Sequence, residues 1–189
     1  MSNAVSALQG KVHEGMASVS EMGLQGMVTL RGDLNDPKFT KAVTSALGLD
    51  VPGLRGVVIT DKTTIAWMSP DELLVSVAHD MADATVAALN TALAEQHHMA
   101  VNVSDARVVV EISGRGAREV LAKLAPVDLS STAFGPGQIR RTRIAQVPAA
   151  FWMTEEDRFI LVAFRSVAQY VFDVLAVSAA QNTEVGFLK

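Results

Sequence analysis

Residues 104–176 decide the fold: SDARVVVEISGRGAREVLAKLAPVDLSSTAFGPGQIRRTRIAQVPAAFWMTEEDRFILVAFRSVAQYVFDVLA. A β-branched run at 108–112 predicts a strand, which stops at the glycines Gly114 and Gly116. The next apolar residues recur at i, i+3, i+4 and i+7, the spacing of one helix face. Pro126 ends this helix because proline lacks the N–H that a continuing helix would need. The stretch therefore begins with a strand followed by a helix.

The remainder of the stretch predicts more strands and a second helix. Ser166 and Gln169 have the spacing of a capping box, which indicates where the last helix begins. Before them, after a turn rich in glycine and proline, three apolar runs predict strands at 141–147, 149–153 and 159–164. The order of elements is therefore β-α-β-β-β-α.

The preceding part of the chain shows a similar order. Asp36 followed by Pro37 is typical of a helix start, and Gly48 is typical of a helix stop. Strands are predicted on either side of this helix, and a second helix follows them. These elements are expected at 26–32, 57–59, 64–68 and 73–77 for the strands and at 80–96 for the helix.

Two short segments recur between the halves. Residues 28–32 (VTLRG) resemble residues 110–114 (VEISG), and residues 67–75 (WMSPDELLV) resemble residues 152–160 (WMTEEDRFI). We therefore predict an α+β fold of two ferredoxin-like β-α-β-β-α halves, as pseudo-repeats at 25–97 and 104–180. Their sheets are expected to form one continuous layer with the helices on one face. Trp67 and Trp152 occupy matching positions in this alignment, and we expect both to be core or interface anchors.

The first 24 residues differ in character from the rest. They are small, polar and without sustained periodicity, so residues 1–24 are expected to form an extended N-terminal arm or a partly disordered tail. Such an arm could grip a partner subunit. Residues 25–189 are expected to form a single domain.

Composition excludes several classes of function. Hydrophobic residues make up 49% of the chain and charged residues 19%, which is typical of a globular protein. The net charge of −4 offers no argument for nucleic acid or an anionic membrane as a partner. Cysteine is missing, so disulfides, thiolate zinc sites, iron–sulfur ligation and cysteine nucleophiles are excluded. We find neither a membrane-spanning run nor a secretory signal, and expect a cytoplasmic protein. The mean hydropathy of +0.27 indicates apolar surface that a partner covers.

Motifs for cofactor or metal binding are weak. Gly114 and Gly116 stand between a strand and a helix, but Glu119 occupies the place of the third glycine of a dinucleotide loop. A plain turn is the better interpretation, although an anion could bind its backbone. His97 and His98 are adjacent, so on a helix they would point about 100° apart and would not share a metal. We expect no metal site.

No catalytic constellation is evident either. The chain contains no Gly-x-Ser-x-Gly elbow, and its paired carboxylates, at 71–72 and 155–157, lie in sequences typical of turns. We therefore predict no catalytic residues, and the sequence does not identify a cofactor-binding residue.

Arginines form the most distinctive local feature. On a strand, Arg141 and Arg143 would share one face, while Arg140 and Thr142 would share the other. The ordinary interpretation is a set of surface arginines that pair with local carboxylates. The alternatives are docking to an acidic face of another subunit, since arginine is favoured at interfaces, and anion binding. The candidate subunit interface comprises Arg140, Arg141, Arg143, Arg115 and Arg118.

Three segments carry a family resemblance: SDARVVVEISGRGAREVLAKLAPVDL, FGPGQIRRTRIAQVPAAFW and FILVAFRSVAQYVFDVLA. In this order they resemble the gamma subunit of heterotetrameric sarcosine oxidase, which is related to the folate-binding domain of the glycine-cleavage aminomethyltransferase. The resemblance covers roughly residues 65–176 and implies an aminomethyltransferase-like fold.

The resemblance also implies a function. The complex would demethylate sarcosine oxidatively to glycine, with hydrogen peroxide and either formaldehyde or 5,10-methylene-tetrahydrofolate as the other products. This chain would be a non-catalytic gamma subunit, inactive by itself, with alpha, beta and delta subunits as partners. FAD, FMN, NAD, zinc and tetrahydrofolate would bind to those other subunits and not to this chain.

Three other functions stay open. A stand-alone folate-binding or one-carbon-transfer protein would usually be about twice as long. Such enzymes also carry a glycine and a glutamate where this chain has Arg141-Thr-Arg-Ile-Ala-Gln-Val-Pro148. The related iron–sulfur maturation protein relies on a cysteine motif, which this chain lacks. A stand-alone binding module is the third.

Overall fold

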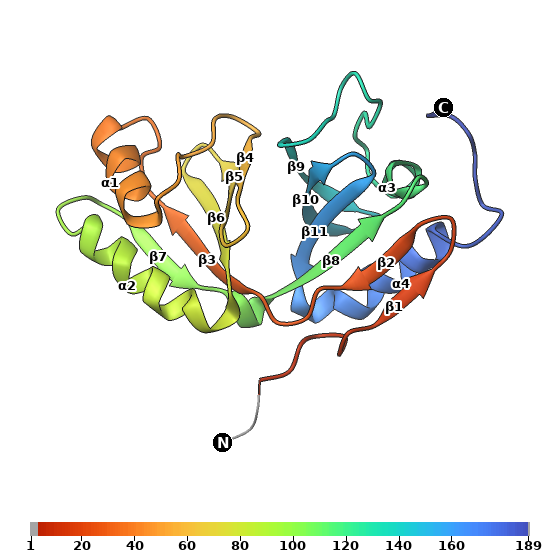
Figure 1. Ribbon diagram of the computed structural model, residues 1–189, viewed down its shortest axis with the longest axis horizontal. Helices are drawn as coiled ribbons and strands as arrows, with labels where there is room; N and C mark the ends of the chain where they lie inside the picture. The colour runs from red at the N-terminus through yellow and green to blue at the C-terminus, as the bar shows by residue number, and fades with distance from the viewer. Residues whose placement is uncertain (1–3, 189) are drawn as a thin grey trace. The chain divides into compact units, whose positions relative to one another are not determined.

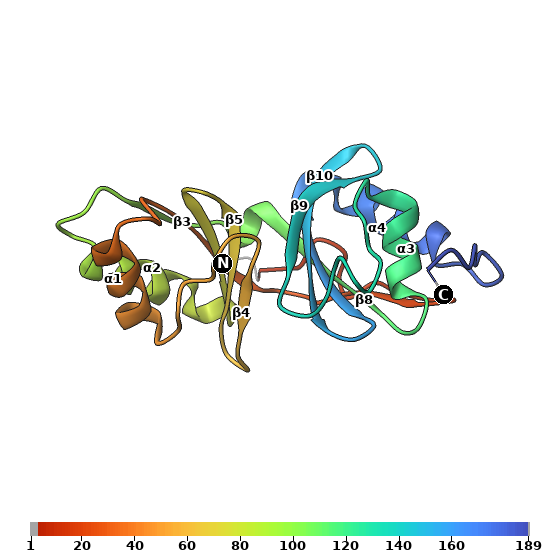
Figure 2. The same cartoon turned by 90° about the horizontal axis from the view of Figure 1, so that it is seen from above.

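The computed structural model describes residues 4–188 and divides the chain into two compact units. Unit 1 contains the described residues up to Leu24 together with those from Asp105 onward, and unit 2 runs from Gln25 to Ser104. Each unit has its own antiparallel sheet and its own pair of helices (Figures 1 and 2). The predicted α+β class with two similar halves is confirmed, but the strands belong to two separate sheets and not to one continuous layer.

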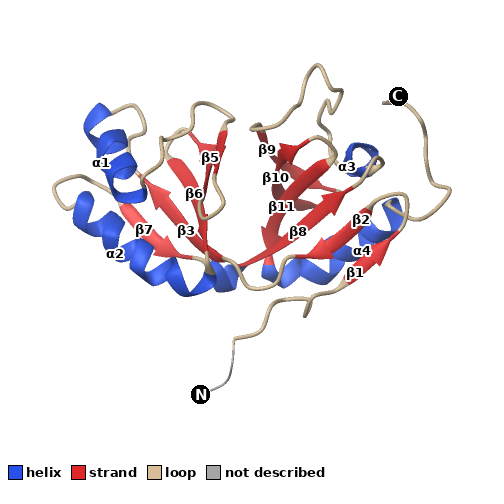
Figure 3. Cartoon of the chain, viewed as in Figure 1, coloured by secondary structure: helices blue, strands red, loops and turns tan. Residues whose placement is uncertain are grey.

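Unit 2 has the ferredoxin-like plan with one added strand. Its sheet has the order β4-β5-β6-β3-β7, and both helices cover one face of it (Figure 3). The N-cap Asp36 accepts a hydrogen bond from the N–H of Lys38, and Gly48 ends the first helix in the left-handed conformation, as predicted. The elements are β3 (Gly26–Arg31), α1 (Pro37–Leu47), β4 (Val57–Ile59), β5 (Thr64–Ser69), β6 (Glu72–Val77), α2 (Ala82–Ala92) and β7 (Met99–Asn102).

Unit 1 has the same plan, except that the strand beside β8 comes from the N-terminal segment and not from the residues after the second helix. Its sheet has the order β1-β2-β8-β11-β10-β9, so β2 lies beside β8 as β7 lies beside β3 in unit 2. The elements are β1 (Val12–Glu14), β2 (Ser18–Glu21), β8 (Arg107–Ser113), α3 (Ala117–Leu124), β9 (Ile139–Ile144), β10 (Val147–Glu155), β11 (Arg158–Phe164) and α4 (Ala168–Ser178). Short 3-10 turns, at 79–81, 104–106 and 165–167, precede α2, β8 and α4.

The predicted N-terminal arm is in part a strand of this sheet. Residues 18–21 pair with β8, and Val19 is fully buried against the core of unit 1. The sequence hides this strand because serines flank its single large apolar residue. Without β2, the edge of β8 would expose a row of unpaired backbone groups. The N-terminal segment therefore completes unit 1.

Backbone hydrogen bonds confirm the repeat at the start of each half. The N–H of Gly32 donates to the carbonyl of Asp71 at 3.1 Å, and the N–H of Gly114 donates to the carbonyl of Asp157 at 2.9 Å. The strand before each glycine pairs in the same register with the strand that follows the turn, as shown by Leu30 opposite Leu73 and Ile112 opposite Phe159.

The alignment of Trp67 with Trp152 is wrong by one residue. Immediately before a β-bulge, Trp67 lies opposite Leu73, and the residue in the same position of unit 1 is Met153, opposite Phe159. A shift of one residue moves a side chain to the other face of a sheet. Trp67 is thus half-buried on the helix-covered face of its sheet. Trp152 is 3% exposed and lies on the face opposite the helices.

Three other predicted boundaries also need correction. The run at 141–147 contains a turn at Ala145, where φ is 48°, so it is divided between β9 and β10. The helix predicted at 80–96 ends at Ala92. Ser166 and Gln169 do not cap α4, whose N-cap is Val167 without a side-chain bond. Gln169 instead donates to Asp173, and this hydrogen bond, with that from Lys11, lowers the pKa of Asp173.

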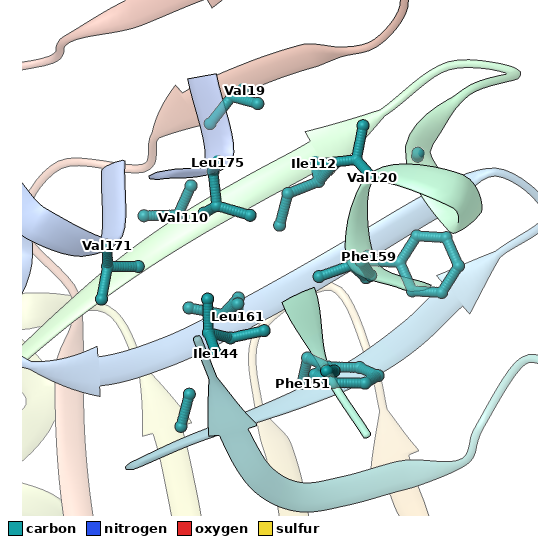
Figure 4. Packing of buried hydrophobic residues seen from close by; sticks show 14 of the residues in the cluster. Val19, Val110, Ile112, Val120, Ile144, Phe151, Phe159, Leu161, Val171 and Leu175 are labelled. Atoms are coloured by element: carbon teal, nitrogen blue, oxygen red, sulfur yellow. The ribbon is translucent and has the colours of Figure 1, made fainter. Parts of the chain in front are cut away.

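The core of unit 1 lies between its sheet and its two helices. Aliphatic side chains from the strands and from α3 and α4 interdigitate there with phenylalanines (Figure 4). Burying side chains of this kind contributes roughly 1.5–3 kcal/mol each. The residues that fill it include Val19, Val110, Ile112, Val120, Ile144, Phe151, Phe159, Leu161, Val171 and Leu175.

One buried carboxylate attaches the start of the chain to this unit. Glu21 is 7% exposed and accepts hydrogen bonds from the backbone N–H of Leu8 at 2.8 Å and of Gly10 at 2.6 Å, and from the hydroxyl of Ser6 at 2.8 Å. It therefore folds residues 6–10 back over β2.

We predict that Glu21→Ala lowers the free energy of unfolding by about 1–3 kcal/mol, because two backbone donors lose their acceptor. Urea denaturation followed by circular dichroism measures this change. Glu14→Ala is the matched control, since Glu14 is an exposed carboxylate on β1 that accepts a hydrogen bond from the hydroxyl of Ser18, and its replacement should cost less than about 0.5 kcal/mol. Equal stability of the two variants would show that the N-terminal segment is not attached in this way.

Candidate subunit interface

The edge strand β9 carries three of the five candidate arginines. Arg141 lies opposite Ala150 and Arg143 lies opposite Pro148, whereas Arg140 lies opposite the core residue Phe151. Arg141 and Arg143 therefore share the sheet face opposite the helices, and Arg140 lies on the helix-covered face, as the alternation predicted. Both Arg141 and Arg143 are exposed.

Arg140 is engaged within unit 1. Its guanidinium donates to the carbonyl of Ala133 at 3.0 Å and to the side chain of Gln138 at 3.3 Å, and it stacks on the ring of Phe134 at 4.8 Å from the centroid. These contacts close the loop that leads into β9. Arg140 is half-buried, and its donors are largely directed to this loop.

Arg118 is buried and has a similar structural role. It donates to the carbonyls of Leu129 at 2.7 Å and Phe134 at 2.8 Å, and it forms an ion pair with Glu156 at 3.2 Å. Arg118 is 7% exposed, and its guanidinium also lies over the ring of Phe159. A buried guanidinium is tolerated when its donors are satisfied in this way. Arg118 therefore holds the loop after α3 against the core.

The ring of Phe134 joins these two arginines to the core. It packs edge-on against Phe151, with centroids 5.6 Å apart, and nearly parallel to Phe159 at 6.1 Å. Pairs of this geometry contribute about 0.5–1.5 kcal/mol beyond their buried area. The loop at 129–138 is thus fixed at its middle by one aromatic side chain and two guanidinium groups.

Arg115 is exposed but lies elsewhere. It follows β8, and β8 and β9 are separated by β11 and β10 in the sheet. Three strand spacings correspond to on the order of 14 Å. The structure thus divides the predicted patch: Arg141 and Arg143 are exposed residues on the same face of β9, Arg118 and Arg140 are used internally, and Arg115 is apart.

The glycine pair before α3 makes a turn of the ordinary kind. Gly114 has a φ of 102°, and its N–H is part of the sheet, so it is not directed toward an open site. Gly116 packs against Met16, where an added Cβ would lie 2.6 Å from the carbonyl oxygen. These glycines therefore serve close packing with the N-terminal segment.

Two other ionisable groups considered from the sequence, Glu72 and His98, have structural partners. Glu72, buried at 6% exposure, forms an ion pair with Arg31 at 2.8 Å and contributes to raising the pKa of Arg31. His98 lies beyond the end of α2, with its ring nitrogens 2.9 Å from the carbonyl of Gln96 and from the side chain of Asn90. Among residues 4–188, no group of three or more histidine or acidic side chains is arranged to hold a metal ion.

No helix in the described part of the chain is long and apolar enough to cross a bilayer.

Sarcosine oxidase gamma subunits from other organisms are similar in sequence to this chain. It is 32% identical over 131 residues to the sarcosine oxidase subunit gamma of Corynebacterium sp. (strain P-1), which covers 68% of this chain and 64% of that one. The gamma subunit of an Arthrobacter species is 32% identical over 123 residues, covering 64% of this chain and 60% of that one. The chain thus spans less than two thirds of the length of these relatives.

Solved structures share the fold. Heterotetrameric sarcosine oxidase from Corynebacterium sp. U-96 contains a chain that matches with a TM-score of 0.81 at 24% identity, over 89% of this chain and 87% of that one. Aminomethyltransferase T of the glycine cleavage system from Bartonella henselae matches with a TM-score of 0.66 at 15% identity, over 89% of this chain and 48% of that one.

These two matches confirm the aminomethyltransferase-like fold that the resemblance implied. The model of the sarcosine oxidase gamma subunit family matches residues 31–181, which span most of both units. The chain belongs to the sarcosine oxidase gamma subunit family.

Proposed function

We propose that this chain is the non-catalytic gamma subunit of a heterotetrameric sarcosine oxidase. The observation that carries the proposal is the family match through residues 31–181. The complex would convert sarcosine to glycine oxidatively, releasing hydrogen peroxide and either formaldehyde or 5,10-methylene-tetrahydrofolate. The family match runs through both pseudo-repeats, which supports treating residues 25–189 as one functional domain, and β2 of the N-terminal segment adds a strand to it.

The partners in this proposal are the alpha, beta and delta subunits, in the cytoplasm. FAD, FMN, NAD, zinc and tetrahydrofolate would be bound by those subunits. The role proposed for the gamma chain is to supply a folded surface to the larger subunits, so the enzyme activity belongs to the assembly.

The use of the buried charges supports a non-catalytic role. Glu21 binds backbone donors, Glu72 pairs with Arg31, and Arg118 binds two loop carbonyls. A general acid or base needs a proton site that a substrate can reach. These groups are instead committed to holding segments of the fold.

The exposed arginines support a docking role for β9. Arg141 and Arg143 place two positive charges on one face of an edge strand, in a chain whose net charge is −4. Guanidinium groups are enriched at protein interfaces because they donate several hydrogen bonds in a fixed plane. We propose that this face of β9 contacts an acidic surface of a larger subunit.

The isolated chain is predicted to be colourless and to oxidise no sarcosine. Purified alone, it should lack the visible absorbance band of a flavin, because the proposal assigns the flavins to the other subunits. Peroxide release from sarcosine, measured with and without added tetrahydrofolate, tests the activity. A stoichiometric flavin band, or turnover by the chain alone, would contradict the proposal. Tight folate binding without the other subunits would favour the stand-alone one-carbon protein.

Reversing Arg143 should separate assembly from stability. We predict that Arg143→Glu changes the unfolding free energy by less than about 1 kcal/mol, because exposed charges contribute little. It should weaken binding to the larger subunits by about 2–5 kcal/mol, because like charges would meet at the interface. Co-purification with tagged partner subunits and a melting curve of the isolated chain measure the two effects.

Arg55→Glu is the matched control, since Arg55 is equally an exposed arginine but belongs to unit 2. It should assemble like the parent. If Arg143→Glu also assembles like the parent at ordinary salt, β9 is not the contact surface.

Arg118 is predicted to behave in the opposite way to Arg143. Arg118→Met should lower the unfolding free energy of the isolated chain by about 1–3 kcal/mol, because the carbonyls of Leu129 and Phe134 lose a buried donor. Thermal denaturation measures the change. A melting temperature equal to that of the parent would show that the loop is held without this guanidinium.

A further inference from the structure

The path of the chain after α4 differs from its path after α2. After α2, it returns to the sheet of unit 2 as β7 beside β3. In unit 1 the same place beside β8 is already filled by β2. The residues after α4, here called the C-terminal tail (179–188), therefore do not enter the sheet and run past α3 instead (Figures 1 and 2).

Two charged side chains of α3 fix the backbone of this tail. Glu119 accepts hydrogen bonds from the N–H groups of Val185 and Gly186, the second at 3.1 Å. Lys123 donates to the carbonyl of Thr183 at 2.6 Å and to that of Ser178 at 3.0 Å. Leu188 packs against the core of unit 1 beyond these bonds. The tail is thus attached to the unit along its length.

Its large apolar side chains nevertheless face water. Val185 is 71% exposed and Phe187 is 85% exposed, although the backbone beside them is bonded to Glu119. An ordered backbone that presents an exposed aromatic ring loses little further entropy when the ring is buried in a partner. Aromatic side chains of this kind are typical anchors at interfaces.

The charges beside the tail indicate the chemistry of its partner. A cavity of about 560 Å³ lies between α3 and the tail, with Met16, Ser131 and Leu188 among its lining residues. Of its four acidic side chains, Glu156 pairs with Arg118 and Glu119 pairs with Lys123, so Asp157 and Glu184 give the rim its acidic character beside Arg115. The charged residues that line it are Arg115, Arg118, Glu119, Glu156, Asp157 and Glu184.

We propose that the C-terminal tail is a docking anchor for a larger subunit of the complex. Phe187 and Val185 would enter an apolar pocket of that subunit, and basic side chains at the rim of the pocket would face Glu184 and Asp157. This inference rests on the proposed function for its partner. It adds a second contact surface in unit 1, separate from β9.

The direct test is Phe187→Ala in the full chain, co-expressed with the alpha, beta and delta subunits. The affinity of the larger subunits for the chain should fall about 30-fold or more, the loss expected for an aromatic anchor. The melting temperature of the isolated chain should stay unchanged, because the ring is exposed. Leu54→Ala is the matched control: Leu54 is 74% exposed and belongs to unit 2, and its replacement should leave the affinity unchanged.

A second variant tests whether the α3 side chains position the anchor. Glu119→Ala releases the N–H groups of Val185 and Gly186 and should weaken assembly severalfold in the parent. In the Phe187→Ala background the same change should have almost no further effect, because there is no longer a ring to position. Equal effects of Glu119→Ala in both backgrounds would show a purely structural role for Glu119.

The outcomes separate this inference from the proposed function. If the parent assembles and Phe187→Ala assembles equally well, the tail is not an anchor while the proposed function stands. Failure of the parent itself to assemble would overturn both. If Phe187→Ala instead abolishes self-association of the isolated chain, measured by sedimentation, and leaves assembly intact, the ring contacts a second copy and the proposed partner is wrong.

Discussion

The pairing of β2 with β8 is the constraint on which the rest of unit 1 depends. An exposed edge on β8 would leave backbone donors and acceptors without partners, and the N-terminal segment satisfies them from the far end of the sequence. This arrangement makes residues 18–21 part of the core, because Val19 is buried with the strands and helices of unit 1. It also has a consequence at the other end of the chain. Since β2 fills the place that β7 fills in unit 2, the residues after α4 have no strand to form, and α3 holds them through Glu119 and Lys123.

The arginines of unit 1 show how one residue type serves two purposes. The guanidinium groups of Arg118 and Arg140 donate to loop carbonyls and stack on phenylalanine rings, so their charge and their hydrogen-bonding capacity are used inside the unit. Arg143 lies on the edge strand β9, and its exposed side chain is on the sheet face opposite the helices. Because alternate residues of a strand face opposite sides, the run at 140–143 places Arg140 on the helix-covered face and Arg141 and Arg143 on the opposite face. The proposed docking surface consists of the two exposed arginines of β9, Arg141 and Arg143.

Much of the fold could be predicted because its signals are local. The cap at Asp36, the stop at Gly48 and the alternation along β9 each depend on neighbouring residues. The predictions that were wrong concern residues whose partners are distant in sequence. The serines around Val19 do not show that β8 needs a neighbour. Trp67 and Trp152 align in sequence, although the pairing of the strands places Met153 at the position of Trp67. At the candidate site, the sequence identified the arginines and their alternation along β9 but not the internal use of Arg118, since its burial depends on Leu129 and Phe134 in a loop without periodicity. Nor did it indicate the exposed ring of Phe187, whose position depends on Glu119.

The central claim is that this chain acts by presenting surfaces of unit 1 to larger subunits. Hydrogen exchange, compared between the isolated chain and the purified four-subunit complex, tests it most directly because it reports where the backbone becomes protected. The account predicts slower exchange in the complex for the peptides that cover β9, at residues 139–144, and the C-terminal tail, at residues 183–188. Peptides from α1 and α2 serve as the internal reference and should be unchanged. Protection confined to α1 and α2, with β9 and the tail exchanging as in the isolated chain, would contradict it.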